Sequence, residues 1–213
     1  AGGNRQLLPQ LRRSYPDDFG CYFEPFVGSG AVFFDLAARG MLGERPAVLT
    51  DENPDLIGCY HRVRDSVGEV LGALKRLARG HERDGAAHYL RVRDDEFNPT
   101  RRAWRTSGAR LEAYTPTLAA MFIYLNRTGY NGLFRLNRSG DFNVPPGRYL
   151  NPRVADADLL SAVSKLLEGV RISLAPFESV LDQAQSGDFV YFDPPYAPMS
   201  PTASFRSYTA FGF

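Results

Sequence analysis

The sequence predicts an α/β protein built around a parallel sheet, and three observations support this fold class. The first is a strand that leads into a glycine loop and a helix over residues 21–39. The second is another strand that ends on an acid, Asp51. The third is the aromatic and β-branched run of residues 189–192, which ends at Asp193 and two prolines. Ligands of open α/β sheets bind at the carboxyl ends of the strands, where these polar groups would lie.

Length and composition fit one soluble domain with an insertion. The 213 residues are 44% hydrophobic and 23% charged, which allows a sizeable core. Cys21 and Cys59 stand alone without metal-ligand spacing, so we expect reduced thiols and no metal site. No apolar run reaches transmembrane length and no signal peptide precedes the first elements, so we expect a cytoplasmic protein that stays out of membranes. The default oligomeric state is a monomer.

The amino-terminal part predicts a helix, a strand and a glycine loop in that order. Residues 5–14 have leucines at helical spacing, and an apolar strand begins at residue 21. Gly28 and Gly30 then lead into a helix over residues 31–39. This loop is compatible with a tight turn or with a nicotinamide or flavin nucleotide site. It lacks the full dinucleotide spacing and the Gly-Lys-Ser/Thr of a phosphate-binding loop.

The next strand, over residues 47–50, ends at Asp51. Asp51 follows Gly28 by 23 positions. This is close to the ~20 expected for an acid that binds ribose hydroxyls after a glycine loop. We therefore expect a ligand that contains a ribose and does not require a pyrophosphate. Residues 61–80 carry valines and leucines at helical spacing, which predicts an amphipathic helix packed on the sheet.

Residues 81–153 are basic, whereas the rest of the chain is acidic. They contain 12 Arg and no Lys against 7 acidic residues, a net of +5, while the remainder has 13 basic against 17 acidic residues. Such a distribution indicates a site for a polyanion. Residues 81–117 are polar and broken by glycine and proline, which predicts an insertion or mobile connector. We interpret Trp104 as local packing and not as a base-stacking residue.

Residues 126–149 predict a long β-hairpin after an apolar helix over residues 118–125. Asn-Gly and Ser-Gly-Asp are hairpin turn signals, and arginines, asparagines and aromatic residues are interleaved with them. Such side chains read base edges, bind phosphates and wedge between bases in DNA-binding proteins. The alternative is a purely structural hairpin, which the density of Arg and Asn disfavours.

The carboxyl-terminal part predicts a helix over residues 156–169, a strand over residues 170–174, and the strand that ends at Asp193. Asp193 and the adjacent prolyl carbonyl can accept hydrogen bonds from an exocyclic amino group, and Tyr196 can stack on the ring that carries it. With a sulfonium as methyl donor, such a site methylates the amine by holding nitrogen and methyl group in line. A base in duplex DNA has to leave the stack to reach it.

These features together resemble the Dam-type, α-ordered group of DNA adenine-N6 methyltransferases. The resemblance covers nearly the whole chain and rests on Ala1-Gly2-Gly3, on residues 24–30, 50–53 and 126–149, and on Asp193-Pro194-Pro195-Tyr196. It implies a Rossmann-like class I methyltransferase sheet with an inserted target-recognition domain made of helices and a β-hairpin. The catalytic domain would comprise residues 1–80 and 154–213, and the insertion residues 81–153.

The resemblance also implies a role for each site residue. The catalytic residues would be Asp193, Pro194, Pro195 and Tyr196. S-adenosylmethionine would be bound without a metal by Gly2, Gly3, Glu24, Pro25, Phe26, Gly28, Gly30, Asp51, Glu52, Phe177 and Asp193. Double-stranded DNA would be bound by Arg127, Tyr130, Asn131, Leu133, Arg135, Asn137, Asn143, Pro145, Arg148 and Tyr149.

Within these sets the resemblance separates several tasks. Asp51 would bind the cofactor ribose, and Phe177 and Glu52 would flank its adenine. Tyr130 and Asn131 would fill the space left by the flipped base. The outer bases would be read by Leu133, Arg135 and Pro145, which match family members that act on GATC, so GATC is the expected target.

Two features depart from the family pattern. Asn4 stands where the family usually has Lys after Ala-Gly-Gly, which bears on cofactor affinity. The family fold continues beyond the Asp-Pro-Pro-Tyr motif through a helix and further strands of a seven-stranded sheet. We therefore expect the carboxyl-terminal strands to be missing from this chain, as in a trimmed part of a larger protein.

Three other functions remain alternatives at this point. A methyltransferase that acts on cytosine N4 or on RNA adenine would use the same tetrapeptide, but the long hairpin disfavours it. A catalytically inactive DNA-binding module would fit a truncated sheet. A nicotinamide-dependent oxidoreductase would leave Asp-Pro-Pro-Tyr without a role.

Overall fold

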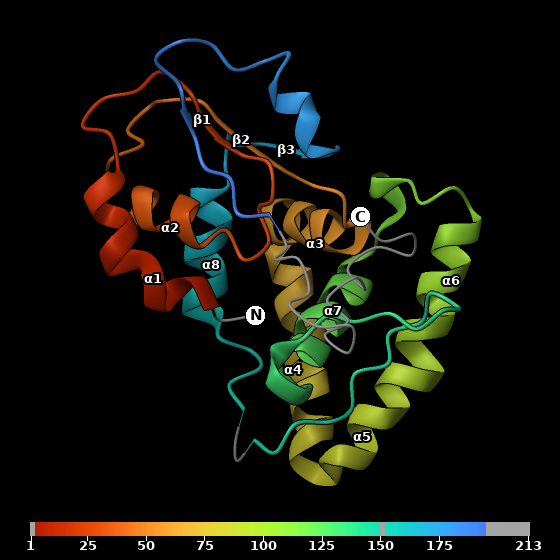
Figure 1. Cartoon of the computed structure of the whole chain (residues 1–213). Coiled ribbons are helices and arrows are strands. Elements are labelled where there is room, and N and C mark those ends of the chain that lie inside the picture. The colour runs from red at the N-terminus through yellow and green to blue at the C-terminus, as the bar shows by residue number, and fades with distance from the viewer. Residues whose placement is uncertain (1–2, 150–151, 195–213) are drawn as a thin grey trace, which may run out of the picture.

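A computed structural model of the chain describes residues 3–149 and 152–194. These residues form a four-stranded parallel sheet with helices packed on it (Figure 1). The spatial order is β3-β2-β1-β4. The strands are β1 (Tyr22–Glu24), β2 (Ala47–Asp51), β3 (Arg171–Leu174) and β4 (Phe189–Val190). The predicted α/β class with a parallel sheet is confirmed.

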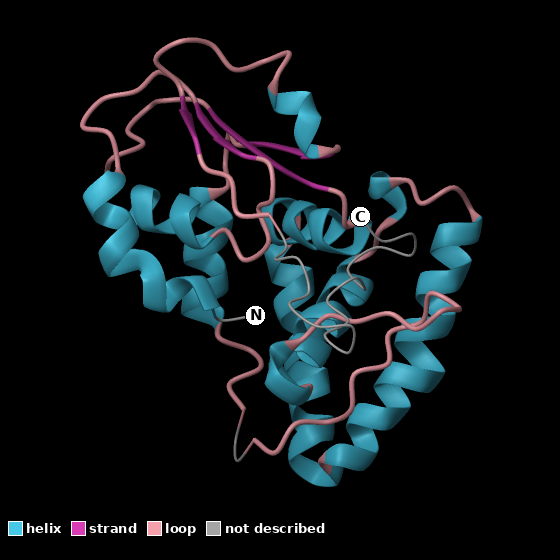
Figure 2. Cartoon of the chain, viewed as in Figure 1, coloured by secondary structure: helices cyan, strands magenta, loops and turns pink. Residues whose placement is uncertain are grey.

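The helices account for most of the remaining described chain, and long loops join them (Figure 2). The α-helices are α1 (Gly3–Leu11), α2 (Ala31–Ala38), α3 (Pro54–Asp65), α4 (Val67–Asp84), α5 (Ala86–Arg91), α6 (Asn98–Thr106), α7 (Pro116–Thr128) and α8 (Ala157–Leu166). Short 3-10 helices cover Arg12–Ser14, Leu111–Ala113, Tyr130–Gly132 and Phe177–Val180, and a π-helix, Val92–Phe97, joins α5 to α6.

The sheet has two unequal faces because side chains alternate along each strand. Tyr22 and Leu49 point into the main core beneath the sheet, with α1, α2, α3 and α8 (Figure 1). Phe23 and Val48 point to the other face, where they form a small cluster with Val180 from the last 3-10 helix. The helical face therefore provides most of the buried apolar area in the described part of the chain.

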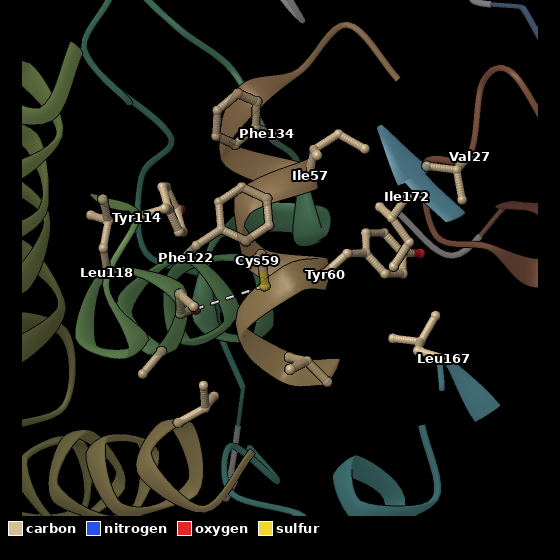
Figure 3. Packing of buried hydrophobic residues seen from close by; sticks show 14 of the residues in the cluster. Val27, Ile57, Cys59, Tyr60, Tyr114, Leu118, Phe122, Phe134, Leu167 and Ile172 are labelled. Atoms are coloured by element: carbon tan, nitrogen blue, oxygen red, sulfur yellow. Dashed lines mark hydrogen bonds between the residues drawn. The ribbon is translucent and has the colours of Figure 1, made fainter. Parts of the chain in front are cut away.

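Helix α3 connects the sheet to the second layer of helices. Its amino terminus is fixed by Asn53, whose side chain accepts from the backbone N–H groups of Asp55 and Leu56, and by Pro54 in the first turn. Tyr60 on α3 lies toward Ile172 of β3, whereas Cys59 lies toward α7, where its sulfur approaches the Ala119 carbonyl (Figure 3). One helix thus packs against both the sheet and the helices that carry the basic region.

Residues 81–117 were predicted to be an insertion or a mobile connector, and the connector is wrong because these residues are mostly helical. Tyr89, Val92, Phe97 and Trp104 are buried among charged residues and form one narrow apolar stripe. The glycines and proline that suggested a loop mark helix ends; Gly85, for example, has φ +52° between α4 and α5. The stripe has few members per turn, which hid the helix from a periodicity argument.

The predicted β-hairpin over residues 126–149 also needs correction. Its described residues form two isolated antiparallel bridges, Gly129 with Pro146 and Leu136 with Phe142, instead of paired strands. Pro145 and Pro146 have no N–H groups for a ladder, and Asn131 takes a left-handed conformation with φ +53°. The chain therefore turns back on itself as a loop.

The predicted boundary at residue 80 falls inside α4, which ends at Asp84.

Candidate active site

The strand order reverses its direction between β1 and β4. The chain adds β2 and β3 on one side of β1 and then returns to add β4 on the other side. At such a reversal the loops after the two neighbouring strands diverge, and ligands bind outside their carboxyl ends. β1 ends at Glu24, and Asp193 follows β4 by three residues. The fold thus positions these two acids at the same edge of the sheet.

The glycine loop after β1 has a shape that few residues other than glycine adopt. Gly28 and Gly30 have φ angles of +46° and +63°. The backbone N–H of Val27 donates to the carbonyl of Thr50 at 3.0 Å, which joins the loop to β2. α2 begins directly after the loop, at Ala31. The amino terminus of α2, with its free backbone N–H groups, therefore follows the carboxyl end of β1 through this short loop.

Tyr60 of α3 supports the loop from below. Its hydroxyl donates to the Gly28 carbonyl at 3.1 Å. A Cβ on Gly30 would lie 2.9 Å from that hydroxyl and 2.9 Å from the Phe34 ring. The glycine at position 30 is therefore required both by the backbone angle and by the closeness of two aromatic side chains.

Asp51 joins the glycine loop to the loop after β2. One carboxylate oxygen accepts from the Gly28 N–H at 3.1 Å and the other accepts from the Asn53 N–H at 2.9 Å. Burial raises the pKa of Asp51, although these two N–H groups act in the opposite direction. Its position at the end of β2, against the glycine loop, is the one predicted from the 23-residue spacing.

Glu24 is a carboxyl group inside the core. Only 3% of the residue is exposed, and one oxygen accepts from the Tyr22 hydroxyl at 2.7 Å and from the Phe33 N–H at 3.1 Å. The pKa of Glu24 is raised to about 8, mainly by burial; the bonds from Tyr22 and Phe33 lower it, and the charges of Asp193 and Asp51 raise it. Three acids from three strand ends, Glu24, Asp51 and Asp193, thus influence one another electrostatically.

Aromatic rings line the outer part of this edge. Phe26 stacks on Phe177 with centroids 5.3 Å apart and an interplanar angle of 24°. The Phe192 ring lies 6.3 Å from Phe26. Glu52 is exposed beside Asp51. The site residues predicted from three separate stretches of sequence therefore meet here, although Phe177 is stacked on another predicted residue.

Several other predicted residues are placed less fully. Pro25 is buried behind the glycine loop, and Pro194 is exposed after Asp193. Gly3 begins α1. Gly2, Pro195 and Tyr196 lie outside the described residues. The described geometry thus covers Asp193 and Pro194 of the tetrapeptide.

A second predicted site, the 126–149 segment, separates its side chains into two sets. Phe134, Leu136, Phe142 and Val144 are buried. Leu133 and Asn143 are half-buried, and the exposed set comprises Arg127, Tyr130, Asn131, Arg135, Asn137, Pro145, Arg148 and Tyr149. The residues predicted to contact DNA are therefore those that the segment turns outward or leaves accessible.

Two of these side chains are held by hydrogen bonds within the segment. Arg135 Nε donates to Asn143 Oδ1 at 2.8 Å, and its Nη2 donates to the Asn143 carbonyl at 3.2 Å. Asn137 Oδ1 accepts from the N–H groups of Ser139 and Asp141, both at 2.9 Å. Arg135 is thus oriented for an outward contact, whereas the Asn137 oxygen shapes the turn.

Sequence reasoning missed the residues that support both sites. Tyr60 lies in α3, just before the helix predicted over residues 61–80, and a tyrosine there gives no local sign of a contact with the glycine loop. Asp55 and Arg101 form a buried ion pair, with Arg101 Nε 2.7 Å from Asp55 Oδ2. This pair joins α3 to α6 across 46 residues of sequence. Their charges are common in exposed positions, so the sequence alone did not distinguish them.

In residues 3–149 and 152–194, no group of three or more His, Cys, Asp or Glu side chains is arranged to hold a metal ion. No helix within the described ranges is both long and apolar enough to span a bilayer.

Comparisons with known proteins identify the family to which the chain belongs. The model of the D12 class N6 adenine-specific DNA methyltransferase family matches residues 1–213. A type II methyltransferase of Lactococcus lactis subsp. cremoris is 38% identical over 216 residues, which cover 100% of this chain and 69% of the relative. A type II methyltransferase of Methanocaldococcus jannaschii is 39% identical over 222 residues, with 100% and 73% covered.

A third relative is named for the methylation of adenine in DNA. The DNA adenine methylase of Escherichia coli is 36% identical over 208 residues, which cover 98% of this chain and 67% of the relative. A family match over the whole chain, together with relatives at this level of identity, establishes the family of this chain. The chain belongs to the D12 class of N6 adenine-specific DNA methyltransferases and is a site-specific adenine methylase.

Proposed function

We propose that this enzyme transfers a methyl group from S-adenosylmethionine to N6 of an adenine flipped out of double-stranded DNA, and that its target is GATC. The observation that best supports this proposal is that Glu24, Asp51 and Asp193 lie together at the carboxyl edge of one parallel sheet. The outward side chains of the 126–149 segment support a DNA contact separate from this edge.

The groups at the sheet edge fit the chemistry of S-adenosylmethionine. Asp51 is an acceptor for ribose hydroxyls and already contacts the glycine loop. Phe26 and Phe177 offer apolar surface for a purine. Asp193 offers a carboxylate to a positively charged ligand, and a bound ammonium or sulfonium would favour ionisation of Glu24, whose pKa burial raises to about 8. When bound, the cofactor supplies a methyl group on positively charged sulfur.

In this proposal Asp193 acts on the acceptor. Its carboxylate accepts a hydrogen bond from the adenine N6 amino group and orients the nitrogen lone pair. It also stabilises the positive charge that develops on nitrogen during transfer. Pro194 keeps Asp193 extended after β4, and we propose that Pro195 and Tyr196 complete the adenine pocket.

We propose that residues 81–153 form the target-recognition insertion and that the remaining residues form the catalytic domain. The net charge of +5 over the insertion supports attraction to the DNA backbone. Tyr130 and Asn131 are exposed at the turn that follows α7 and would occupy the space left by the flipped adenine. Leu133, Arg135 and Pro145 would read the outer base pairs. We further propose that the protein acts as a monomer.

Remaining family residues complete the two proposed sites. Gly2, Gly3, Pro25 and Glu52 would contribute to cofactor binding, while Arg127, Asn137, Asn143, Arg148 and Tyr149 would position the duplex. The Asn137 oxygen already shapes a turn, so we expect its amide NH₂ to make the DNA contact.

The test is methyl transfer from labelled S-adenosylmethionine by the full-length protein. Duplexes that contain GATC should be labelled, and duplexes with a scrambled site should not. Asp193→Ala should abolish labelling and retain DNA binding, because it removes the acceptor for the N6 amino group. Equal labelling of both duplexes would contradict GATC, and loss of DNA binding in the variant would indicate a structural role for Asp193.

A further inference from the structure

A row of polar side chains on one helical run holds the backbone of the 126–149 segment. The row consists of Tyr89, Arg93, Asn98 and Arg101, and we call it the polar row. Tyr89, Asn98 and Arg101 are buried, with exposed fractions of 0%, 6% and 1%. Buried polar groups cost stability unless they are hydrogen-bonded, so their partners indicate what the row is for.

All four side chains bond to backbone atoms of alternate residues. Arg101 donates to the Gly140 carbonyl. Asn98 binds Phe142 from both sides, since its Nδ2 donates to the Phe142 carbonyl at 3.0 Å and its Oδ1 accepts from the Phe142 N–H at 2.9 Å.

The Val144 carbonyl accepts two further bonds from the polar row. The Tyr89 hydroxyl and Arg93 Nη1 each donate to it at 3.0 Å. The held residues alternate along the sequence: Gly140 lies in the turn, with φ +79°, and Phe142 and Val144 follow it. The polar row therefore holds every second residue from 140 to 144.

The π-helix Val92–Phe97 explains why these four residues line up. Tyr89 and Arg93 are four apart and Asn98 and Arg101 three apart, which places each pair on one face of an α-helix. Arg93 and Asn98 are five apart. The Asn98 N–H donates to the Arg93 carbonyl, and in a π-helix residues five apart lie above one another. The extra residue brings both pairs onto one face.

Because Phe142 and Val144 are held, the residue between them is held in place as well. Asn143 lies between the held positions, and its side chain and carbonyl accept from Arg135. The Asn143 N–H in turn donates to the Arg135 carbonyl at 3.1 Å. The position of the Arg135 guanidinium thus depends on Asn143, whose two neighbours in the sequence are held by the polar row.

We propose that Tyr89, Arg93, Asn98 and Arg101 are positioning residues that determine sequence discrimination by holding the base-reading side of the segment in register. The inference rests on the proposed function, because it assigns base reading to Arg135. Within the segment the row bonds to backbone atoms only, so it would support different outward side chains equally well. It also reaches the cofactor edge, since Arg101 pairs with Asp55, four residues after Asp51.

The test compares matched substitutions in the full-length enzyme. Tyr89→Phe removes one hydroxyl that bonds the segment, and Asn98→Ala removes both bonds to Phe142. Tyr124→Phe is the matched control, since Tyr124 is equally buried and its hydroxyl instead bonds His81 at 2.9 Å. Ser164→Ala is a second control, because Ser164 bonds the Arg64 carbonyl outside the segment.

Two readouts are measured for each variant. The first is the ratio of kcat/KM for a GATC duplex to that for a duplex changed at one base pair. It should fall at least about fivefold in Asn98→Ala, less in Tyr89→Phe, and stay unchanged in both controls. The second is hydrogen exchange of the Phe142 amide without DNA, which should accelerate in Asn98→Ala only.

Each outcome has a defined meaning. Unchanged discrimination in Asn98→Ala and Tyr89→Phe, at thermal stability equal to the controls, would overturn the proposal. Equal loss of discrimination in the controls would also overturn it, because the effect would then follow general destabilisation. If the wild-type enzyme shows no preference for any duplex, the proposed function fails. The exchange of the Phe142 amide would then still decide whether Asn98 holds the segment.

Discussion

The glycine loop and the 126–149 segment are held in different ways. Gly28 and Gly30 take their shape from backbone angles and from neighbours a few tens of residues away, namely Asp51 and Tyr60. The 126–149 segment contains few backbone pairs and depends on side chains from the helical run before it. A loop fixed by backbone geometry keeps one ligand in one place. A segment whose backbone is held by buried side chains leaves its exposed side chains able to determine sequence specificity.

The buried ion pair joins the two regions, so breaking it should have the largest effect on stability. Arg101→Met should lower the free energy of unfolding by about 3–5 kcal/mol, because Asp55 is left as an unpaired buried acid. Burial already raises the Asp55 pKa, so the acid should become protonated in this variant. Urea denaturation measures the loss.

The paired substitution Asp55→Leu with Arg101→Met is the control for this change. Removing both charges leaves no unpaired ion, so much of the stability should return. A double variant no more stable than Arg101→Met would show that the pair acts through other contacts. The Gly140 carbonyl, which loses its Arg101 donor in both variants, is the first such contact to examine.

Glu24 should give the next largest effect, and it belongs to the sheet edge alone. Its folded pKa of about 8 lies above its ordinary value of 4.5. Its contribution to stability is therefore fully present below pH 4.5 and is lost as pH rises through about 8. Glu24→Gln keeps the acceptor oxygen and removes the ionisation, so at pH 8.5 it should be more stable than wild type by a few kcal/mol.

Urea denaturation at pH 5 and pH 8.5 measures the difference between Glu24→Gln and wild type. The two proteins should have similar stability at pH 5 and diverge at pH 8.5. Parallel pH profiles would mean that the Glu24 pKa is the same in the folded and unfolded states. Asp51 remains in both proteins and serves as an internal reference.

Gly30 should give a smaller effect that tests the backbone account of the loop. Gly30→Ala places a Cβ at φ +63° against Tyr60 and Phe34, and Gly40→Ala places one at φ +71° in open space. Both should lose about 1–2 kcal/mol to backbone strain. Gly30→Ala should lose more because of the contacts and should also weaken S-adenosylmethionine binding, as measured by calorimetry. Equal losses with unchanged binding would contradict the role of Tyr60.

The same contrast explains which features the sequence predicts. The sheet edge was predictable because its signals are local: a glycine loop, an acid 23 positions later, and an acid before two prolines. The outward side chains of the 126–149 segment were also predictable from their types. The polar row was not, because Asn98 and Arg101 acquire their role from a π-helical turn and from partners about 40 residues away. Periodicity carries no signal for such contacts.

The central claim is that the sheet edge performs methyl transfer while the 126–149 segment chooses the sequence. Mapping methylated adenines in the DNA of cells that express wild-type enzyme or Arg135→Ala tests it most directly. We expect the wild-type enzyme to methylate GATC. The Arg135→Ala enzyme should also methylate sites changed at one base pair, with discrimination against those sites lowered by ~1–3 kcal/mol. A uniform loss of methylation at all sites, with GATC preference intact, would contradict it and make Arg135 a phosphate contact.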